Sequence, residues 1–492
     1  MRRGVDMDKL RNSKCSEVFR YFEEISAIPR GSGNEKQISD HMVEFAKKHN
    51  LEVIQDKAMN VIIKKPAAPG YENAPTVILQ GHLDMVCEKN KSTVHDFEKD
   101  PISLRVVDDM IYAEGTTLGA DDGIALAYAM TLLASKDMPH PGLEVLFTSD
   151  EENTMSGAPA LDAGKLSGRI LINLDSEEEG RFLVSSAGGL KAKLVIPVKW
   201  EKAPANMPAF RVGIGGLKGG HSGMEINKGR GNANKLLGRL LDRLGRECDI
   251  YIAEINGGLK SNAIPREAEV LLLTAAENTA KLEAIIKEQE PLYKNELRAS
   301  DPGVHTIFEA ASDKAEKVFS KETADSVIAS MVLLPNGIQS MSMEIAGLVE
   351  SSTNLGVVKT TEGEVWLVNE IRSSVKSLKR NTYGQVLTLA DTVGGSVKIE
   401  SEYPEWEYNP DSKIRPLFIK TYKKKYGAEP EIIAIHAGLE CGVFMSKIGD
   451  LDAISLGPDM FDVHTPDEHL SIPSTERVWE LLLEVLKDIK DI

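Results

Sequence analysis

The sequence has few cysteines and no long apolar run, and both shortages narrow the classes of protein to which it can belong. Four cysteines among 492 residues lie far apart and form no CxxC pair, so neither a disulfide framework nor a thiolate zinc site is expected. No stretch reaches the about 18 apolar residues that a membrane span requires. The basic start is not followed by the apolar segment of a signal peptide. We therefore expect a cytoplasmic protein without a membrane partner.

Positive charge is scarce relative to negative charge. Lysine and arginine number 58 against 75 aspartates and glutamates, and the formal net charge is -17. Nucleic acid is not expected as a partner, because a phosphate backbone requires a basic face. Small cations and metals stay compatible with this balance. Hydrophobic residues at 42% are typical of a globular protein, and the length exceeds the roughly 250 to 300 residues of one core, so two domains are expected.

The first part of the chain has the pattern of an α/β domain. Short, nearly continuous apolar runs occur at residues 76–79, 143–148 and 170–174. Such runs suit strands that are buried on both faces of a mainly parallel sheet. Residues 124–134 are apolar nearly all round, which predicts a buried helix. Helices and buried strands in alternation indicate a layered α/β fold.

The middle of the chain differs, and the first pattern then returns. Residues 187–402 predict an α+β domain of paired strands and amphipathic helices, in two comparable stretches that suggest an internal duplication. After residue 403, candidate buried strands appear at 431–435 and 453–456. We therefore expect one discontinuous α/β domain, residues 1–186 and 403–492, with the middle domain inserted into it.

Acidic residues and a histidine gather where the predicted strands end. His82 and Asp84 follow the first apolar run, Glu151 and Glu152 follow the second, and Asp175 follows the third. Ligands of open α/β sheets bind beyond the carboxyl ends of the strands, so we expect these side chains in one crevice. Each residue alone also has an ordinary interpretation, because a strand-end histidine can pack in a core and acidic loops are usually solvated.

Two further segments point to the same crevice. Asp121 and Asp122 lie in the turn GADDG before the expected buried helix, and His464 lies in DVHTP after the last candidate strand. Two imidazoles with several carboxylates suit zinc, manganese or cobalt, and a bridging carboxylate lets two cations share a site. The residues alone do not decide between Asp121 and Asp122, or between Glu151 and Glu152, as ligands.

Several motifs together resemble the dinuclear zinc exopeptidases, a family that includes carboxypeptidase G, aminoacylases, tripeptidase T and carnosinases. These motifs are GHLDMV at 81–86, LGADDG at 118–123, TSDEE at 148–152, HAGLEC at 436–441 and HTP at 464–466. Within the family, the chain looks similar to the bacterial aminoacyl-histidine or cytosolic non-specific dipeptidases. The resemblance spans essentially the whole chain, and it implies a catalytic α/β domain of zinc exopeptidase type with an inserted lid or dimerisation domain.

The resemblance also implies a metal centre and a reaction. Two divalent ions, zinc or else cobalt or manganese, would be held by His82, Asp121, Glu152, Asp175 and His464. Asp121 would bridge them, Asp84 would orient His82, and Glu151 would be the general base. The implied reaction is hydrolysis of unblocked dipeptides, Xaa-His among them, by a metal-bridging water. The alternatives are a tripeptidase or N-acyl amino acid amidohydrolase of the same family and, last, a non-catalytic binding protein.

The resemblance further points to substrate-binding residues in the lid. His221 in GGHSG matches a histidine that reaches over the substrate carbonyl, and Asn262 in SNAIP matches a lid asparagine. Arg372 in NEIRS matches an arginine that binds the substrate carboxylate, for which its planar fork is suited. His436 is placed near the substrate terminus, or else has a structural role. The resemblance implies a homodimer, although a monomer suffices if the duplicated lid supplies both halves of the site.

Overall fold

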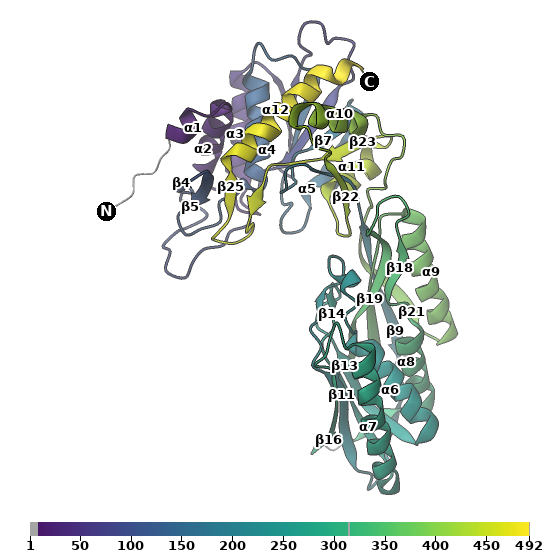
Figure 1. Cartoon of the computed structure of the whole chain (residues 1–492). Coiled ribbons are helices and arrows are strands. Elements are labelled where there is room, and N and C mark those ends of the chain that lie inside the picture. The colour runs from purple at the N-terminus through teal and green to yellow at the C-terminus, as the bar shows by residue number, and fades with distance from the viewer. Residues whose placement is uncertain (1–7, 313–314, 492) are drawn as a thin grey trace. The chain divides into compact units, whose positions relative to one another are not determined.

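A computed structural model describes residues 8–312 and 315–491 and divides the chain into two compact units, whose elements are labelled in Figure 1. Unit 1 comprises Met1–Ser185, Tyr408–Ala434 and Glu440–Ile492, and unit 2 comprises Ser186–Glu407 and Ile435–Leu439. Residues 1–7 and 492 of the α/β domain expected from the sequence, and residues 313–314 of the expected insert, lie outside the described residues.

The main sheet of unit 1 has eight strands, and its central four run parallel. The strand order is β1-β2-β6-β3-β7-β23-β8-β22. Strands β6, β3, β7 and β23 are parallel neighbours. Strand β1 is antiparallel to β2, β2 is antiparallel to β6, and β8 is antiparallel to β23. The bounds are β1 Glu52–Gln55, β2 Val61–Lys65, β3 Val77–His82, β6 Leu143–Thr148, β7 Ile170–Asn173, β8 Arg181–Ser186, β22 Glu431–Ile435 and β23 Asp452–Ser455. The α/β class is confirmed, with a parallel centre in a mixed sheet.

The apolar runs predict the central strands well and one outer strand less well. Strands β3, β6 and β7 are buried along their whole length, as both covered faces require. The run at 431–435 does form β22, but its expected burial is wrong. Glu431 is exposed and the other four residues are partly exposed, because β22 is the outermost strand of the sheet.

Helix α4, Ala120–Ala134, is the buried helix of unit 1, and all of its residues except the last are buried. It packs against β3 and α2. Tyr128 of α4 stacks on Trp479 of α12 with ring centroids 5.6 Å apart, so the last long helix helps to close this core. The other helices of unit 1 are α1 Asp8–Arg11, α2 Ser16–Ser26, α3 Lys36–Lys48, α5 Gly157–Ala160, α10 Ile414–Tyr426, α11 Glu440–Ile448 and α12 Ile472–Asp488.

A small four-stranded sheet in unit 1 brings the end of the chain to the start of α4. Its order is β24-β25-β5-β4, from β4 Leu104–Val107, β5 Met110–Ala113, β24 Met460–Phe461 and β25 His469–Ser471. Strands β24 and β25 pair antiparallel, so residues 462–468 form the loop between them. Strand β25 also pairs with β5, which directly precedes the GADDG turn. The pairing therefore holds the loop that carries His464 beside that turn.

Unit 2 is built from two copies of one β-α-β-β-α-β arrangement that share an antiparallel sheet. Its order is β16-β11-β15-β13-β19-β20-β9-β21, and β18 Gly337–Met341 pairs with β19. Counted from the outer edge of the sheet to its centre, each half has its strands in the order fourth, first, third, second, and β13 pairs with β19 at the centre. This repeated order agrees with the duplication suggested by the sequence. The first half is β11 Ala209–Gly215, α6 Ala233–Glu247, β13 Ile250–Gly257, β15 Ala268–Thr274, α7 Thr279–Glu296 and β16 His305–Ala310. The second half is β9 Gly188–Pro197, α8 Lys321–Leu333, β19 Val349–Thr360, β20 Glu364–Ser373, α9 Lys376–Thr392 and β21 Ser396–Tyr403.

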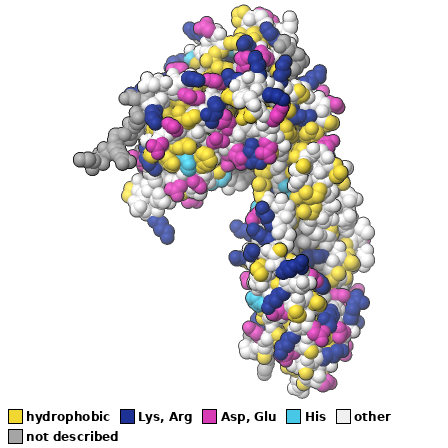
Figure 2. Space-filling view, viewed as in Figure 1, with side chains coloured by type: hydrophobic (Ala, Val, Ile, Leu, Met, Phe, Trp, Pro, Cys, Tyr) yellow, Lys and Arg dark blue, Asp and Glu magenta, His cyan; other side chains and the backbone are white. Residues whose placement is uncertain are grey.

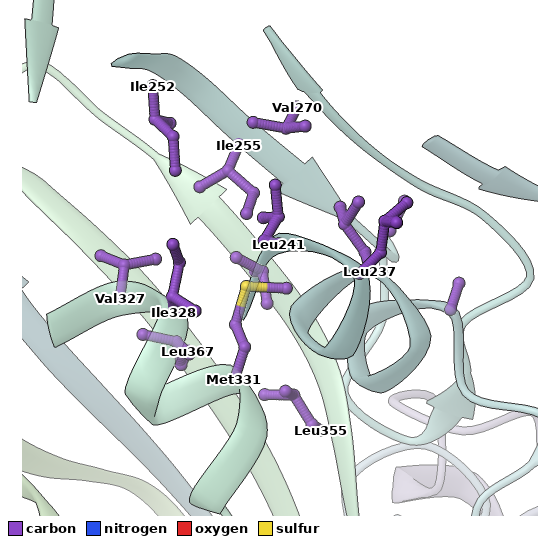
Figure 3. Close-up of a cluster of buried hydrophobic side chains, with 14 of the residues drawn as sticks. Leu237, Leu241, Ile252, Ile255, Val270, Val327, Ile328, Met331, Leu355 and Leu367 are labelled. Atoms are coloured by element: carbon purple, nitrogen blue, oxygen red, sulfur yellow. The ribbon is translucent and has the colours of Figure 1, made fainter. Parts of the chain in front are cut away.

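A single hydrophobic cluster runs through both halves of unit 2. Helices α6 and α8, which are equivalent in the two halves, pack against each other and against the sheet. Figure 3 shows Leu241 of α6 and Met331 of α8 at this contact, close to Ile255 of β13. The two halves therefore share one core and are not separate domains.

Charge is mixed over the surface of the protein. Basic and acidic side chains are interspersed on the face shown in Figure 2. The four cysteines are free thiols, and three of them are buried. Within the described ranges, none of the helices combines the length and the apolarity that crossing a membrane would require.

Candidate metal centre

The five side chains proposed as metal ligands lie together in unit 1. Three of them stand at the carboxyl ends of the central strands: His82 ends β3, Glu152 follows β6 and Asp175 follows β7. Asp121 lies at the start of α4, and His464 lies on the loop between β24 and β25. Five separate segments thus converge at one edge of the sheet, as expected for an α/β fold.

The distances divide these residues into two groups that share Asp121. His82 Nε2 lies 3.0 Å from Asp121 Oδ1 and 3.3 Å from Asp175 Oδ1. His464 Nε2 lies 3.1 Å from Asp121 Oδ2 and 3.0 Å from Glu152 Oε1. Within each group, the potential ligand atoms all lie within 4.8 Å of one another. The two oxygens of Asp121 therefore face two different groups.

The chemistry of both groups fits a divalent cation. Each offers one imidazole nitrogen and two carboxylates, a donor set suited to zinc and related ions. The carboxylates crowd together: burial first, and then the charge of Asp121, raises the pKa of Asp175. Hydrogen bonds to Asp121 and Glu152 raise the pKa of His464 to about 11. The centre therefore favours added positive charge, which two cations would supply.

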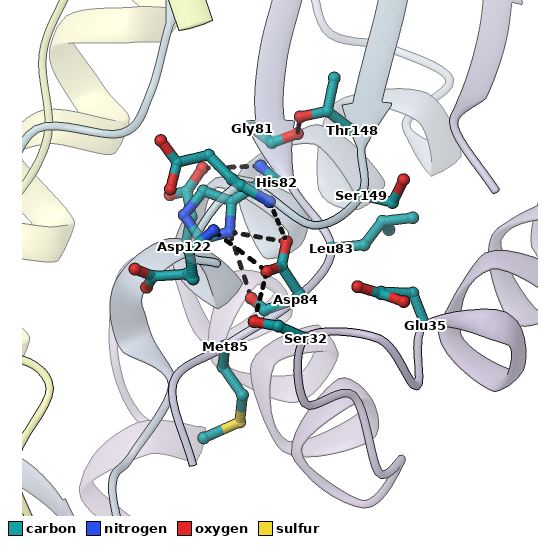
Figure 4. A network of polar contacts seen from close by, with 12 residues as sticks. Ser32, Glu35, Gly81, His82, Leu83, Asp84, Met85, Asp122, Thr148 and Ser149 are labelled. Carbon is teal, nitrogen blue, oxygen red and sulfur yellow. Dashed lines mark hydrogen bonds and ion pairs between the residues drawn. The ribbon is translucent and has the colours of Figure 1, made fainter. Parts of the chain in front are cut away.

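Asp84 organises the centre in a way that sequence spacing did not anticipate. His82 Nδ1 donates a hydrogen bond of 3.2 Å to the main-chain carbonyl of Asp84, while the Asp84 carboxylate lies 3.6 Å from that nitrogen (Figure 4). The carboxylate accepts hydrogen bonds from Ser32 Oγ at 2.7 Å and from the main-chain N–H groups of Glu151 at 3.0 Å and Glu152 at 3.2 Å. Asp84 thus holds the turn that carries both glutamates, in addition to lying beside His82.

The neighbouring acids that the residues alone left undecided have different surroundings. Asp122 accepts the main-chain N–H of His82 at 3.1 Å, so its carboxylate supports the end of β3. The peptide bond between Asp121 and Asp122 is cis. Glu151 is partly buried on the same turn as Glu152, and burial raises its pKa to about 9. A carboxyl group with a raised pKa is suited to accept and return a proton.

Three buried charged residues that are not among the proposed ligands lie beside the centre. Glu440 accepts hydrogen bonds from Gln80 at 2.8 Å and Thr148 at 2.6 Å. Arg30 and Glu468 bind main-chain groups of the ligand-bearing turns. The signal was present in the sequence, because Glu440 lies inside the HAGLEC motif and Glu468 follows His464 by four residues. Their side chains bind main-chain groups or uncharged side chains, and spacing does not reveal such partners.

The four substrate-binding candidates lie in unit 2. His221 is in β12, Gly220–His221, which pairs with β14, Ala263–Ile264, directly after Asn262. Arg372 is near the end of β20, and His436 lies in the segment Ile435–Leu439. A Cβ atom at Gly223 would lie 3.1 Å from His221, 3.2 Å from the Arg372 side chain and 2.4 Å from the His436 carbonyl. Three of the four candidates therefore surround one glycine.

This part of unit 2 contains a tyrosine beside Arg372 that the sequence did not single out. Arg372 Nη1 donates a 2.5 Å hydrogen bond to the hydroxyl of Tyr403, while its buried Nε has no hydrogen-bond partner among the described residues. His436 Nε2 lies 2.7 Å from Ser352 Oγ. Burial first, and then the charge of Arg372, lowers the pKa of His436 to about 3. The guanidinium also has the buried carboxylate of Glu370 3.8 Å from its Nη2, so its unpartnered Nε is the group left for a further acceptor.

Known proteins and structures resemble this chain along its whole length. A family model described as peptidase family M20/M25/M40 matches residues 78–488. The chain is 38% identical over 484 residues to the cytosol non-specific dipeptidase of Escherichia coli (strain K12), covering 98% of this chain and 99% of that protein. The aminoacylhistidine dipeptidase of Vibrio alginolyticus superposes with a TM-score of 0.92 at 39% identity, covering 97% of each chain. Aminopeptidase PepT of Bacillus cereus, at 16% identity and a TM-score of 0.55 over 96% of this chain and 98% of that one, shares the fold.

Proposed function

Because the chain belongs to peptidase family M20/M25/M40, we propose that it is a cytoplasmic dipeptidase that uses two divalent metal ions bound in unit 1. The observation that carries the proposal is the shared position of Asp121, whose two oxygens face two imidazole–carboxylate groups. The similarity to the Escherichia coli non-specific dipeptidase and the Vibrio alginolyticus aminoacylhistidine dipeptidase supports dipeptides, Xaa-His among them, as the substrates.

The residues of unit 1 divide the work of hydrolysis. His82, Asp121 and Asp175 would hold one ion, and Asp121, Glu152 and His464 would hold the other. When bound, the ions would polarise a peptide carbonyl and lower the pKa of a water molecule. The carboxylate of Glu151 would take the proton from the attacking water and deliver it to the leaving amine, a contribution of about 10²- to 10⁴-fold. Asp84 would keep Glu151 in place by accepting a hydrogen bond from the main-chain N–H of Glu151.

The residues of unit 2 would recognise the rest of the peptide. Arg372 would bind the free carboxylate, since its fork can make two parallel hydrogen bonds. His221 and Asn262 would donate hydrogen bonds to the peptide carbonyl. His436 would line the site as a neutral imidazole, which its lowered pKa supports. A carboxylate anchor of this kind favours short, unblocked peptides.

The metal and the oligomeric state complete the proposal. We favour zinc, with cobalt or manganese as alternatives, because all three accept mixed imidazole and carboxylate ligands. The resemblance implies a homodimer, whereas unit 2 carries His221 and Asn262 in its first half and Arg372 in its second. This arrangement supports a lid whose residues all come from one chain. Light scattering together with specific activity at several protein concentrations distinguishes the two states.

A substrate panel tests the proposed activity. The zinc-loaded protein is assayed on Ala-His, β-Ala-His, Ala-Ala, an N-acetylated dipeptide, a tripeptide and an N-acyl amino acid. We expect cleavage of the free dipeptides and little cleavage of the blocked or longer substrates. Preference for the tripeptide or the N-acyl amino acid would support the alternative family activities instead. Zinc binding without hydrolysis of any substrate would contradict a peptidase function.

A further inference from the structure

We propose that Arg30 and Glu468 are positioning residues that hold the shared aspartate of the metal centre in place. Both lie in unit 1, and each is only 2% exposed. They bind the turn before α4, which carries Asp121, through its carbonyl and its N–H groups respectively. The inference rests on the metal-binding part of the proposed function and extends it to residues beyond the ligands.

Arg30 ties together the two turns that carry His82 and Asp121. Its Nη1 donates hydrogen bonds to the carbonyl oxygens of Leu83 at 3.0 Å and Asp84 at 2.9 Å, and its Nη2 donates to that of Gly119. Leu83 directly follows His82, and Gly119 precedes Asp121 by two residues. Because a guanidinium is planar and rigid, it fixes the spacing between these carbonyl groups.

Glu468 ties the same turn to the loop that carries His464. Its Oε2 accepts hydrogen bonds from the N–H groups of Leu118 at 2.8 Å and Gly119 at 3.1 Å, and its Oε1 accepts one from Ala120 at 2.8 Å. Glu468 follows His464 by four residues. The two imidazole groups of the centre are therefore linked to one turn by two buried charges.

The position of Glu468 explains why Asp121 is free to face the imidazoles. The exposed N–H groups at the start of a helix attract an anion, and an acidic residue of the first turn ordinarily meets that need. At the start of α4 the carboxylate of Glu468 meets it instead. Asp121 therefore keeps one oxygen for His82 and the other for His464.

The glycines of the GADDG motif leave room for Arg30. A Cβ atom at Gly119 or at Gly123 would lie 2.6 Å from Arg30 Nη2 in either case. Gly119 also has a φ of 69°, in the left-handed region that favours glycine. The two glycines of the motif are thus explained by contact with the guanidinium of Arg30, a residue that is distant in sequence.

Both charges are buried without a direct ion-pair partner. Among the described residues, no ion pair within 4.0 Å involves Arg30 or Glu468. Burial of such charges costs free energy, and here main-chain dipoles and the longer-range attraction between Arg30 and Glu468 offset that cost. Folds tolerate such costs chiefly where function requires them. Both charges lie beside the shared ligand Asp121, so the function that they serve is the placement of the metal ligands.

The test measures zinc binding and not activity. Glu468→Gln and Arg30→Lys are compared with Glu144→Gln, a control at a buried carboxylate that also pairs with Lys64 Nζ at 3.0 Å. Glu144 is 3% exposed and accepts the N–H groups of Ser167 at 2.8 Å and Gly168 at 2.9 Å, but it lies near the opposite end of β6. Zinc affinity of the metal-free proteins is measured by competition with a chromogenic chelator, and thermal unfolding of the same metal-free samples reports the structural cost.

We expect Glu468→Gln and Arg30→Lys to weaken both zinc-binding steps by roughly 10- to 100-fold, as loss of supporting contacts does at metal sites. Glu144→Gln should lower the unfolding temperature to a similar degree and leave both steps unchanged. If Glu468→Gln does not fold, Gly123→Ala, which displaces the guanidinium, is expected to weaken both steps as Arg30→Lys does. Parental zinc affinity in the folded variants, or weakening of one step alone, overturns the positioning role and leaves the proposed function intact. A parent protein that binds no zinc overturns both.

Discussion

The candidate sites of the two units give their histidines different surroundings, and one histidine in each shows the difference. His464 in unit 1 is hydrogen-bonded to Asp121 and Glu152, which raise its pKa to about 11. His436 in unit 2 is buried near Arg372, and burial followed by that charge lowers its pKa to about 3. The same side chain is therefore favoured as a cation among the carboxylates of unit 1 and as a neutral imidazole in the buried setting of unit 2.

This difference suits two groups of one substrate. A peptide carbonyl under attack develops negative charge that metal ions stabilise, whereas the free carboxylate needs a fixed cation such as Arg372. Variants that act on one unit should therefore change turnover or substrate affinity, but not both equally.

Removal of the metal ions should have the largest effect. Dialysis against a strong chelator is expected to abolish dipeptide hydrolysis, because the carboxylates of unit 1 then repel one another and no polarising cation is left. Activity should return when zinc, cobalt or manganese is added, as followed by a dipeptidase assay with metal analysis. Hydrolysis that survives complete removal would show that unit 1 is not a metal centre.

Replacement of the proposed general base should come next. Glu151→Gln is expected to lower kcat by about 10²- to 10⁴-fold, because the amide cannot accept the proton. Metal content, measured by atomic emission, should be unchanged, since the proposed ligands are intact. Full activity in Glu151→Gln would exclude the assigned role.

Loss of the cation in unit 2 should mainly raise KM. Arg372→Met is expected to lower kcat/KM by roughly 10- to 100-fold, the usual value of a hydrogen-bonded charge. Zinc affinity should match that of the parent, which separates this variant from any in unit 1. Steady-state kinetics on a free dipeptide and on its C-terminal amide provide the measurement, and an equal loss on both substrates would contradict carboxylate binding.

Asp84 tests the support of the metal centre. Asp84→Ala removes the acceptor of the Glu151 and Glu152 N–H groups, so we expect metal affinity or activity to fall by roughly 10- to 100-fold. The fold should be retained, as checked by circular dichroism. If metal affinity and kcat were both unchanged, the Asp84 carboxylate would have no role in supporting the metal centre.

The pH dependence of stability gives the smallest predicted effect. Because the pKa of His436 is about 3 in the folded protein and ordinarily 6.5, the unfolded chain binds a proton that the folded chain does not. Stability from this group is complete above pH 6.5 and is lost as the pH falls toward 3. Between about pH 7 and pH 5, the parent should lose about 2 kcal/mol more than His436→Gln in urea unfolding. Equal losses would mean that the pKa of His436 is not lowered in the folded protein.

Much of the fold could be predicted from local sequence, and the exceptions have a common cause. The runs that became β3, β6 and β7 are apolar because both faces of each strand are covered. The similar run of β22 is at the outer end of the sheet. Its position depends on strand order, which local hydrophobicity does not encode, so its burial was predicted wrongly.

The candidate site shows the same limit more sharply. Motif resemblance selected Asp121 over Asp122, and this assignment stays a prediction until ligand variants are measured. The contact of Asp122 with the His82 N–H gives that residue a separate task. The roles of Arg30 and Glu468 could not be predicted from the sequence, because their partners are main-chain groups, which every residue possesses.

The sequence by itself determined the α/β class, the repeated pattern of strands and helices in the middle region, and the residue types of the metal centre. These follow from periodicity and from motifs that extend over a few neighbouring residues. Only the tertiary structure decided that the two oxygens of Asp121 face His82 and a histidine 343 residues away. It also decided that Asp84 holds the glutamate turn and that Glu468 meets the start of α4. Such contacts depend on the directions of main-chain groups after distant segments have packed, and no local pattern specifies them.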